Sequence, residues 1–449
     1  MRTPATTSLA QCHHPGCVCS RNPDPPSSHP KWKDQDVREG SLRSKGLGRL
    51  AAPLFVAVIV QSVANLLFHA VVGRALEPAE YGALGTVLAA MTLVAVPLSA
   101  LQTASARATA VSGLSSNTAR RLIWRTTLYS SPVIILLLVA SIPIQHFLHL
   151  GSVWDAVILA PTLLVAALIA VVRGLLLGIG RSGVVAGSYI LSTVVRLGPG
   201  LALAYFYGVT GALVGTLLGE VCAMLMVAFA VLRAPDGPLA QLSGGDYLRT
   251  GLVVSGLFVF TTVDLFLARH FLPEAVSGGY VAAATIGKTV LALPAAAVSI
   301  AYPRLVAGWV DRLGFPALKS AVIVVGAPAM AVAAVVAAVP GLVLGVLYGF
   351  GTYSDAIQVT RVLALVAGLN AFVSVLTHAG LARSGWTQWL PWAGAVIEIG
   401  LILVLHSSAT VIAMCSAISA IVVVLVLAVV EVPVWRRRAL VGATLDRED

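Results

Sequence analysis

Five ionisable residues lie inside long apolar stretches of this chain, where a charge is energetically costly. They are Arg196, Glu220, Asp264, Lys288 and Glu398. An ionisable side chain in such a segment usually pairs with another charge or takes part in binding a ligand, an ion or a proton. The two cations can attract an anionic group such as a diphosphate, and the three carboxyl groups can carry protons. These residues are the first candidates for a functional site.

The apolar stretches that carry them are long and frequent. Hydrophobic residues form 58% of the chain and charged residues 11%, against roughly 45–50% and about 25% in soluble proteins. With a mean hydropathy of +0.91, the chain is predicted to be an all-α polytopic membrane protein. We expect twelve membrane spans, each near the ~20 residues that a helix needs to cross the hydrocarbon. They are residues 50–73, 83–106, 124–144, 153–172, 183–207, 210–232, 249–270, 281–301, 319–339, 358–381, 387–405 and 410–432.

Basic residues cluster at alternate connections between these spans. Because positive residues concentrate on the cytoplasmic side of membrane proteins, both termini are predicted to be cytoplasmic. The basic residues of that side are Arg107, Arg120, Arg121, Arg125, Arg173, Arg181, Arg233, Arg249, Arg304, Arg312, Lys319, Arg383, Arg436, Arg437 and Arg438. The opposite side has Arg74, Arg269 and Arg361. The net charge of +10 thus reports topology, and we expect no nucleic-acid partner.

The two halves of the membrane region repeat each other. Residues 74–82 (RALEPAEYG), between spans 1 and 2, match residues 269–280 (RHFLPEAVSGGY), between spans 7 and 8. Pro97 and Pro294 occupy matching places in spans 2 and 8, where each is expected to kink its helix. Because the halves are offset by an even number of spans, they enter the membrane from the same side and form a parallel repeat.

The repeat defines the domain organisation. We expect a six-helix bundle at residues 50–232, a cytoplasmic linker at 233–248 and a second six-helix bundle at 249–432, facing each other across a central cavity. This arrangement is typical of alternating-access transporters. Residues 433–449 form a basic cytoplasmic tail. Residues 1–49 are polar, rich in proline and without apolar periodicity, so a disordered cytoplasmic tail is expected.

The cysteines indicate neither a metal site nor a disulfide framework. Cys222 and Cys415 lie within apolar spans and are read as small core residues. The N-terminal tail groups metal-ligand residue types, but their spacing fits no zinc framework. We therefore expect no metal and no cofactor. The tail group is Cys12, His13, His14, Cys17 and Cys19.

Three segments resemble Wzx-type polysaccharide flippases. They are residues 74–85 (RALEPAEYGALG) in the first loop, 173–181 (RGLLLGIGR) between spans 4 and 5, and 347–353 (LYGFGTY) before span 10. The resemblance covers about residues 50–432. It extends to the multidrug/oligosaccharidyl-lipid/polysaccharide exporter superfamily, which also holds MATE-type multidrug exporters and lipid II flippases.

The resemblance implies a function and a location. It implies a non-enzymatic flippase that moves a polyprenyl-diphosphate-linked oligosaccharide from the inner to the outer leaflet of the bacterial inner membrane, for cell-surface polysaccharide biosynthesis. The expected partners are this lipid-linked substrate and membrane lipids, with a glycan polymerase or glycosyltransferase as candidate protein partners. The protein itself is expected to be a monomer.

Four of the charged residues form two couples, and the members of each couple lie at similar depth on neighbouring spans. At 1.5 Å per residue, Asp264 and Lys288 lie roughly 9–10 Å from the outer ends of their spans, and Arg196 and Glu220 about 15–16 Å. Each couple can form an ion pair that locks two helices together. Alternatively, the cations face the cavity and bind the substrate diphosphate. For Lys288 the resemblance favours the cavity, because spans 1, 2, 7 and 8 line it in similar transporters.

The remaining carboxyls and polar groups have weaker assignments. Glu398 has no partner at its depth except Asn370. It is a candidate for proton coupling, as is Glu220, although a neutral hydrogen-bonded carboxyl fits equally well because desolvation disfavours the charged form. Polar groups in spans 1 and 2 are candidates for binding sugar hydroxyls, or for hydrogen bonds between helices. These are Gln61, Asn65 and Gln102.

Arg107 and Arg304 end spans 2 and 8 at matching positions. Their location is typical of residues that anchor topology at the cytoplasmic surface. They are also suited to the first capture of the substrate's diphosphate headgroup at the inner leaflet.

Several other functions compete with the flippase. A MATE-type exporter of cationic drugs should have a cavity rich in acids and aromatics, whereas aromatics form 7% of this chain. Relatives of the lipid II flippases have an arginine within span 1, but here span 1 reaches Arg74 only at its outer end. No nucleotide-binding motif indicates an ATP-driven pump, and no long loop indicates a membrane glycosyltransferase or ligase. A scaffold for a glycan-assembly complex stays open.

Overall fold

The computed structural model describes residues 32–233, 245–310 and 314–445. In these ranges the chain is α-helical with short 3₁₀ and π segments and no β-strand. Residues 32–49, which we expected to be disordered, belong to helix α1 (Trp32–Ala75). No proline occurs between Pro30 and Pro53, and the Lys, Gln, Glu, Arg and Leu residues of this stretch favour a helix. The Cys and His group of the tail lies outside the described residues.

Eight helices make up the first half of the described chain. They are α1, α2 (Pro78–Ser112), α3 (Ser116–Val139), α4 (Ser141–Phe147), α5 (Val153–Val157), α6 (Leu159–Gly178), α7 (Ser182–Leu197) and α8 (Pro199–Leu232).

The second half contains nine α-helices and three short segments. They are α9 (Gly245–Phe260), α10 (Val263–Phe271), α11 (Glu274–Val310), α12 (Phe315–Ala321), the π-helix η1 (Val322–Gly326), α13 (Ala327–Ala338), α14 (Pro340–Tyr348), the 3₁₀-helix η2 (Ser354–Ala356), α15 (Ile357–Ala382), the 3₁₀-helix η3 (Trp386–Trp389), α16 (Leu390–Val404) and α17 (Ala409–Leu445).

Each of the twelve predicted spans coincides with one helix or with a succession of helices. Ten helical segments of the described chain are long and apolar enough to cross a membrane. The two predicted spans outside these ten are the one that contains α7, a shorter apolar helix, and the one within the 37-residue α11. The chain is a multi-pass membrane protein of the all-α class.

Gly208 separates the two spans that α8 joins. Its φ of 58° and ψ of −135° are not helical, and glycine adopts such a conformation without the steric penalty of a side chain. The chain folds back there, so that a Cβ on Gly215 would lie 2.3 Å from Cα of Gly200. The turn predicted between the spans that end at residue 207 and begin at residue 210 is therefore present, inside the element labelled α8.

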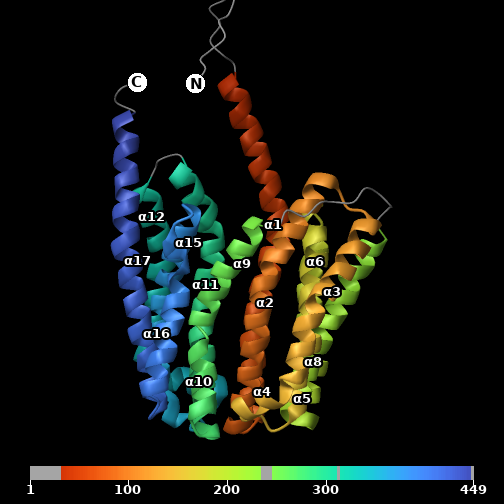
Figure 1. Ribbon diagram of the computed structural model, residues 1–449, viewed down its shortest axis with the longest axis vertical. Coiled ribbons are helices and arrows are strands. Elements are labelled where there is room, and N and C mark those ends of the chain that lie inside the picture. Colours follow the sequence, from red (N-terminus) through yellow and green to blue (C-terminus); the bar gives the residue numbers. More distant parts are fainter. Residues whose placement is uncertain (1–31, 234–244, 311–313, 446–449) are drawn as a thin grey trace, which may run out of the picture. The chain divides into compact units, whose positions relative to one another are not determined.

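The helices gather into two bundles that run side by side, α1–α8 in one and α9–α17 in the other (Figure 1). Core clusters lie within each bundle, and one cluster of the second bundle also includes Tyr81 and Ala89 of α2. Pro97 lies within α2 and Pro294 within α11, the two helices that pack against each other between the bundles.

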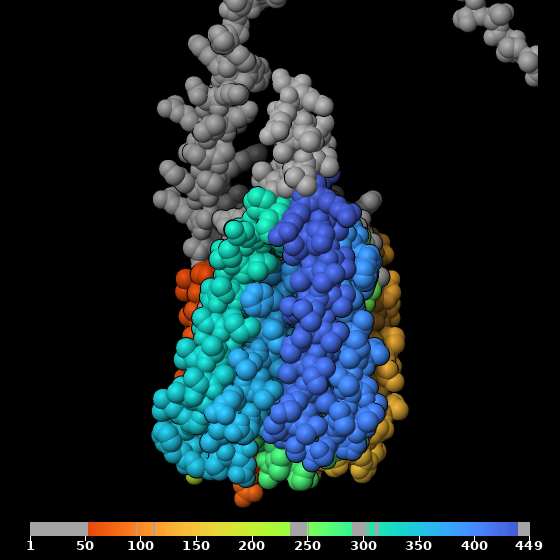
Figure 2. Space-filling view, turned by 90° about the vertical axis from the view of Figure 1, so that its left-hand side faces the viewer, coloured from red at the N-terminus to blue at the C-terminus, as the bar shows by residue number. Residues whose placement is uncertain are grey.

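The two ends of the bundles differ in charge. We call one end the basic end; helices α2, α6, α8, α11 and α15 end there. At the other end, which we call the opposite end, α4, α5 and α10 are found (Figure 1). Along the outside, α17 runs beside the segment that begins with α12 (Figure 2), and side chains such as Leu425 and Val429 are exposed on it. Exposed apolar side chains on a long helix are typical of contact with lipid.

Helices α2 and α6 approach each other through two glycines spaced four residues apart. A Cβ on Gly174 would lie 2.2 Å from the carbonyl oxygen of Gln102, and one on Gly178 would lie 2.1 Å from that of Ala106. Small residues at this spacing allow the backbones of membrane helices to come close.

The first prediction concerns this packing. Replacing Gly174 with alanine forces α2 and α6 apart, so the free energy of unfolding is expected to fall by about 1–3 kcal/mol. Thermal unfolding of the purified protein in detergent measures the change. Gly183→Ala is the control, because nothing lies within 4 Å of a Cβ at Gly183. Equal melting temperatures for the two variants would contradict the prediction.

Candidate functional site

Arg196 is held by uncharged and aromatic groups. It lies in the last turn of α7, where the helix dipole favours a positive charge. One terminal guanidinium nitrogen donates to Oδ1 of Asn65 over 2.8 Å, and the guanidinium carbon lies 4.0 Å from the ring centre of Phe68. The Nε–H is buried and has no partner among the described residues. A second acceptor can therefore bind to this guanidinium.

The second cation is Lys288 of the second bundle. It lies on α11 and is partly buried, and both Lys288 and Arg196 interact electrostatically with His69 of α1. Among the described residues, no hydrogen bond and no ion pair within 4.0 Å holds the Lys288 ammonium. Two cations, one from each bundle, thus act electrostatically on one imidazole. We call Arg196, Lys288, His69 and Asn65 the cation cluster.

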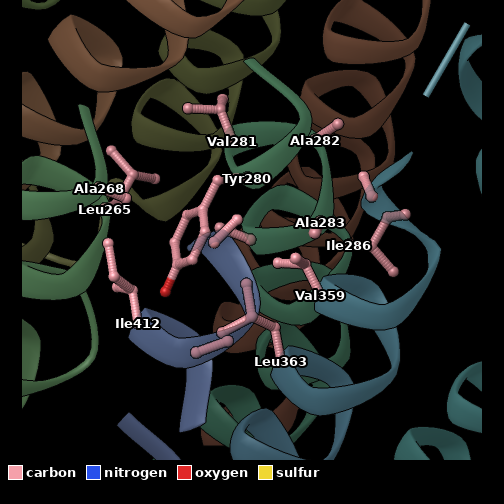
Figure 3. Packing of buried hydrophobic residues seen from close by; sticks show 14 of the residues in the cluster. Leu265, Ala268, Tyr280, Val281, Ala282, Ala283, Ile286, Val359, Leu363 and Ile412 are labelled. Carbon is pink, nitrogen blue, oxygen red and sulfur yellow. The ribbon is translucent and has the colours of Figure 1, made fainter. Parts of the chain in front are cut away.

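An ion pair of Asp264 with Lys288 was one of two predicted arrangements, and no such pair within 4.0 Å is present among the described residues. The two groups interact electrostatically, but the carboxylate Oδ2 of Asp264 instead accepts a hydrogen bond of 2.7 Å from the hydroxyl of Tyr280. The Tyr280 ring lies among the buried Leu265 of α10 and Ile412 of α17 (Figure 3). Tyr280 was not among the predicted partners, because a neutral hydroxyl does not stand out in a pattern of charged residues.

The first bundle repeats this arrangement with different residues. His69 Nδ1 and the hydroxyl of Tyr81 lie 3.1 Å apart in a hydrogen bond, and the same hydroxyl is 3.1 Å from that of Tyr348. Tyr81 and Tyr280 close the two copies of the repeated loop. In each half, therefore, a tyrosine at the start of the second span binds a titratable group in the first. The repeated tyrosine was the sequence signal for this contact.

The described residues likewise contain no ion pair within 4.0 Å between Arg196 and Glu220, which was one of the two arrangements considered for them. Oε1 of Glu220 accepts a hydrogen bond of 2.7 Å from Ser192, one turn before Arg196 on α7. The reason is a change of register at Gly198, where α7 ends: Gly200 faces Gly215, but Ser192 faces Gly219. Depth counted along an unbroken helix could not include this change.

Arg173 is the cation nearest to the Glu220 carboxylate. Its NH2 lies 3.9 Å from Oε2 of Glu220, and its Nε donates to Ser188 over 2.9 Å. The guanidinium also lies 3.9 Å from the ring centre of Tyr189. We expected Arg173 at a cytoplasmic connection, but its side chain is buried within α6. These contacts join α6, α7 and α8, so Glu220 lies among residues that hold these three helices together.

Glu398 shares a small polar cavity with Asp264. The cavity has a volume of about 20 Å³ and is lined by Phe260, Thr261, Asp264, Val366, Asn370, Glu398 and Ser416. Asn370 is thus a neighbour of Glu398, as their depths predicted. Asn370 Oδ1 and Glu398 Oε2 are buried, and neither has a hydrogen-bond partner among the described residues. A cavity of this size has room for about one water molecule.

Comparisons with known proteins identify the fold. No protein-family model and no curated protein sequence matches the chain significantly. An inward-facing multidrug resistance MATE family transporter of the MOP superfamily matches in structure with a TM-score of 0.67 and 18% identity, over 88% of this chain and 99% of that one. The chain has the MOP-superfamily fold.

Other solved structures agree with this fold. The lipid II flippase MurJ in an inward closed conformation matches with a TM-score of 0.65 and 13% identity, over 87% of this chain and 90% of its own. A MOP superfamily transporter from Pyrococcus furiosus matches with a TM-score of 0.60 and 17% identity, over 88% and 95%. The two bundles predicted from the repeat are those of the MOP-superfamily fold.

The other predicted site residues differ in exposure, and the side chain of one of them is not described. Gln61 of α1 and Gln102 of α2 are partly buried, and Arg107 is exposed near the basic end of α2. Arg304 belongs to α11, but its side chain is outside the described part of the structure. Cys415 is buried and Cys222 partly buried, as expected of small core residues.

Proposed function

We propose that this protein is a flippase that moves a polyprenyl-diphosphate-linked oligosaccharide between the leaflets of a bacterial inner membrane. The two bundles would open alternately to the cytoplasm and to the outside. The MOP-superfamily fold supports a transporter, and the loop motifs of the sequence favour the polysaccharide branch. The substrate headgroup would occupy the space between the bundles while its lipid chain stays in the bilayer.

One observation supports this proposal: each bundle contributes one cation to the cation cluster. Lys288 has no ion-pair partner within 4.0 Å among the described residues, and Arg196 is bound by the neutral Asn65 rather than by a carboxylate. A diphosphate has several oxygens that can accept charge-assisted hydrogen bonds from both cations. An anionic substrate would therefore stabilise the approach of the two bundles.

The acidic residues argue against a MATE-type exporter of cationic drugs. Asp264 and Glu398 face a cavity of about 20 Å³, whereas sites for drug-sized molecules measure about 300–1,000 Å³. This acidic cavity suits a small ion or a proton. A cationic drug bound beside Arg196 and Lys288 would meet charges of its own sign.

The acidic cavity is our candidate for the coupling site. Asp264 and Glu398 interact electrostatically, and two negative charges this close repel each other unless a proton or a cation neutralises one of them. Asp264 also interacts with Lys288 of the cation cluster. Neutralising the cavity changes the electrostatic field at Lys288, and this links the coupling ion to the substrate.

The second prediction tests the coupling site. In proteoliposomes, an imposed proton or sodium gradient is expected to leave the flux of the Glu398→Gln variant almost unchanged, at about onefold. Equilibration of the substrate between the leaflets without a gradient should continue. The amide has the size of the carboxyl but carries no charge that a proton or a cation could neutralise. Asp355→Asn, at an exposed residue, is the control and should respond to the gradient like the wild type. Full stimulation in Glu398→Gln would exclude this residue as a coupling group.

Mass spectrometry of polyprenyl-linked glycans in cells depleted of this protein tests the function. Accumulation of one lipid-linked oligosaccharide on the inner leaflet is expected, and its mass would identify the substrate. An unchanged lipid pool with new sensitivity to cationic toxins would overturn the flippase in favour of a MATE-type exporter. Accumulation of lipid II alone would assign the protein to peptidoglycan synthesis.

A further inference from the structure

Three arginines lie at the opposite end of the bundles, where the distribution of positive charge predicts few. They are Arg74, Arg269 and Arg361. Basic residues on the side away from the cytoplasm do not serve the usual topological role. Their contacts show what two of them do instead.

Arg74, at the end of α1 in the first bundle, reaches into the second bundle. Its Nε donates to the carbonyl oxygen of Leu347 over 2.9 Å, and its NH2 donates to that of Val346. Both carbonyls belong to the last turn of α14. Carbonyls at the end of a helix lack partners within it, and the helix dipole there favours a cation.

Arg269, at the end of α10 in the second bundle, reaches into the first. Its Nε donates to the carbonyl oxygen of Leu148 over 2.8 Å, and its NH2 donates to that of His149 over 2.7 Å. Leu148 is the C-cap of α4. A third nitrogen donates to the carbonyl oxygen of Ala79 in α2, at 3.2 Å.

The two contacts are equivalent under the internal repeat. Arg74 and Arg269 begin the two copies of the repeated loop. Each binds two successive carbonyls at the C-terminal end of a short helix in the other bundle, α14 or α4. Arg361, by contrast, binds the Ala337 carbonyl oxygen and the side chain of Gln358, both within its own bundle.

The helices between the two arginines are in backbone contact. A Cβ on Gly278 of α11 would lie 1.8 Å from the carbonyl oxygen of Pro78 in α2. One on Gly85 of α2 would lie 2.2 Å from Cγ1 of Val281. The seam between the bundles is therefore closed at this end, and Arg74 and Arg269 lie on either side of it.

We propose that Arg74 and Arg269 form a reciprocal clasp that holds the opposite end closed and is released when that end opens. The proposal rests on the alternating access of the proposed function. Each arginine exchanges its carbonyl acceptors for water on opening, so the clasp is reversible. Arg269 is buried at 1% exposure and Arg74 is exposed, so Arg269 contributes more to closure.

Labelling of a seam cysteine tests the clasp without any substrate. The reporter is Val281→Cys in a full-length protein without its five native cysteines, because Val281 is 1% exposed. The reagent is a membrane-impermeant maleimide. Arg74→Gln is expected to raise the labelling rate at least about tenfold, because its charge-assisted hydrogen bonds to the two carbonyls are lost, and Arg269→Gln should raise it further. Arg361→Gln, which breaks bonds within one bundle, should leave the rate within about twofold.

A second reporter separates opening from unfolding. Val227→Cys lies in the core of the first bundle at 0% exposure and should stay unlabelled in every variant. If Val227→Cys is labelled in the Arg269→Gln variant, that variant is unfolded. The Arg74→Gln variant, which changes an exposed residue, then tests the clasp by itself. If Val281→Cys is labelled no faster in the Arg74→Gln variant than in the Arg361→Gln variant, the clasp is overturned. This holds even if lipid-linked glycans accumulate when the protein is depleted. Faster labelling supports the clasp whatever the substrate is.

Discussion

Replacement of Lys288 with alanine is expected to reduce transport more than tenfold while leaving the stability of the protein near that of the wild type. A buried cation that pairs with a carboxylate would behave differently, because its removal leaves an uncompensated charge and costs about 3–5 kcal/mol. Here Asp264 already accepts a hydrogen bond from Tyr280, and Lys288 has no ion-pair partner within 4.0 Å in the described chain. Its loss removes a ligand for the substrate and leaves no orphaned carboxylate. The loss of one charge-assisted contact, about 1.5–3 kcal/mol, corresponds to roughly 10- to 150-fold.

Flux of a polyprenyl diphosphate in proteoliposomes and the melting temperature in detergent measure the two parts of this prediction. Lys288→Arg keeps the positive charge and should retain part of the flux. Lys319→Ala is the matched control, since Lys319 is exposed at the basic end. Wild-type flux in Lys288→Ala would give Lys288 a structural role only. A large fall in its melting temperature would indicate an ion pair after all.

The elements of this fold could be predicted from the sequence because membrane helices must be long and apolar. The hydrophobic runs gave the spans, and the repeated loop gave the two bundles. Depth along a helix was also usable, since Glu398 and Asn370 line one cavity. The face that each helix turns toward its neighbour could not be predicted, because a helix break such as the one at Gly198 rotates and shifts the residues that follow it. That is why Ser192, and not Arg196, meets Glu220.

The neutral partners of the charged residues were predicted only in part. Tyr280 binds Asp264 and Asn65 binds Arg196, two charged residues for which an ion pair was one of the predicted arrangements. Hydrogen bonds from neutral groups can satisfy a buried charge without a counterion, so charge balance alone does not predict partners. The tyrosines could have been found, because the repeat places Tyr81 and Tyr280 at the ends of its two copies.

The position of an arginine relative to the membrane did not predict its contacts. Arg173 and Arg383 were both assigned to cytoplasmic connections, yet each approaches a glutamate within the bundles. Arg74 and Arg269 were exceptions to the charge pattern and join the bundles instead. Arginine serves these roles because its planar group donates several hydrogen bonds in fixed directions.

Arg383 forms a buried ion pair at the basic end. Its NH2 donates to Oε1 of Glu431 over 2.7 Å and its Nε to Oε2 over 2.9 Å. The Glu431 carboxylate is fully buried and also accepts hydrogen bonds from Thr387 and from the indole of Trp435. The pair therefore ties the end of α15 and the η3 segment to α17.

Arg383→Met is expected to lower the free energy of unfolding by about 3–5 kcal/mol, because Glu431 would keep a buried charge without its cation. Thermal or denaturant unfolding of the purified protein measures this loss. The double variant Arg383→Met with Glu431→Gln should recover much of it, since glutamine removes the charge and keeps an acceptor for Thr387 and Trp435. Lys319→Ala should melt with the wild type. A double variant no more stable than Arg383→Met would show that packing of the guanidinium, rather than compensation of the Glu431 charge, stabilises this end.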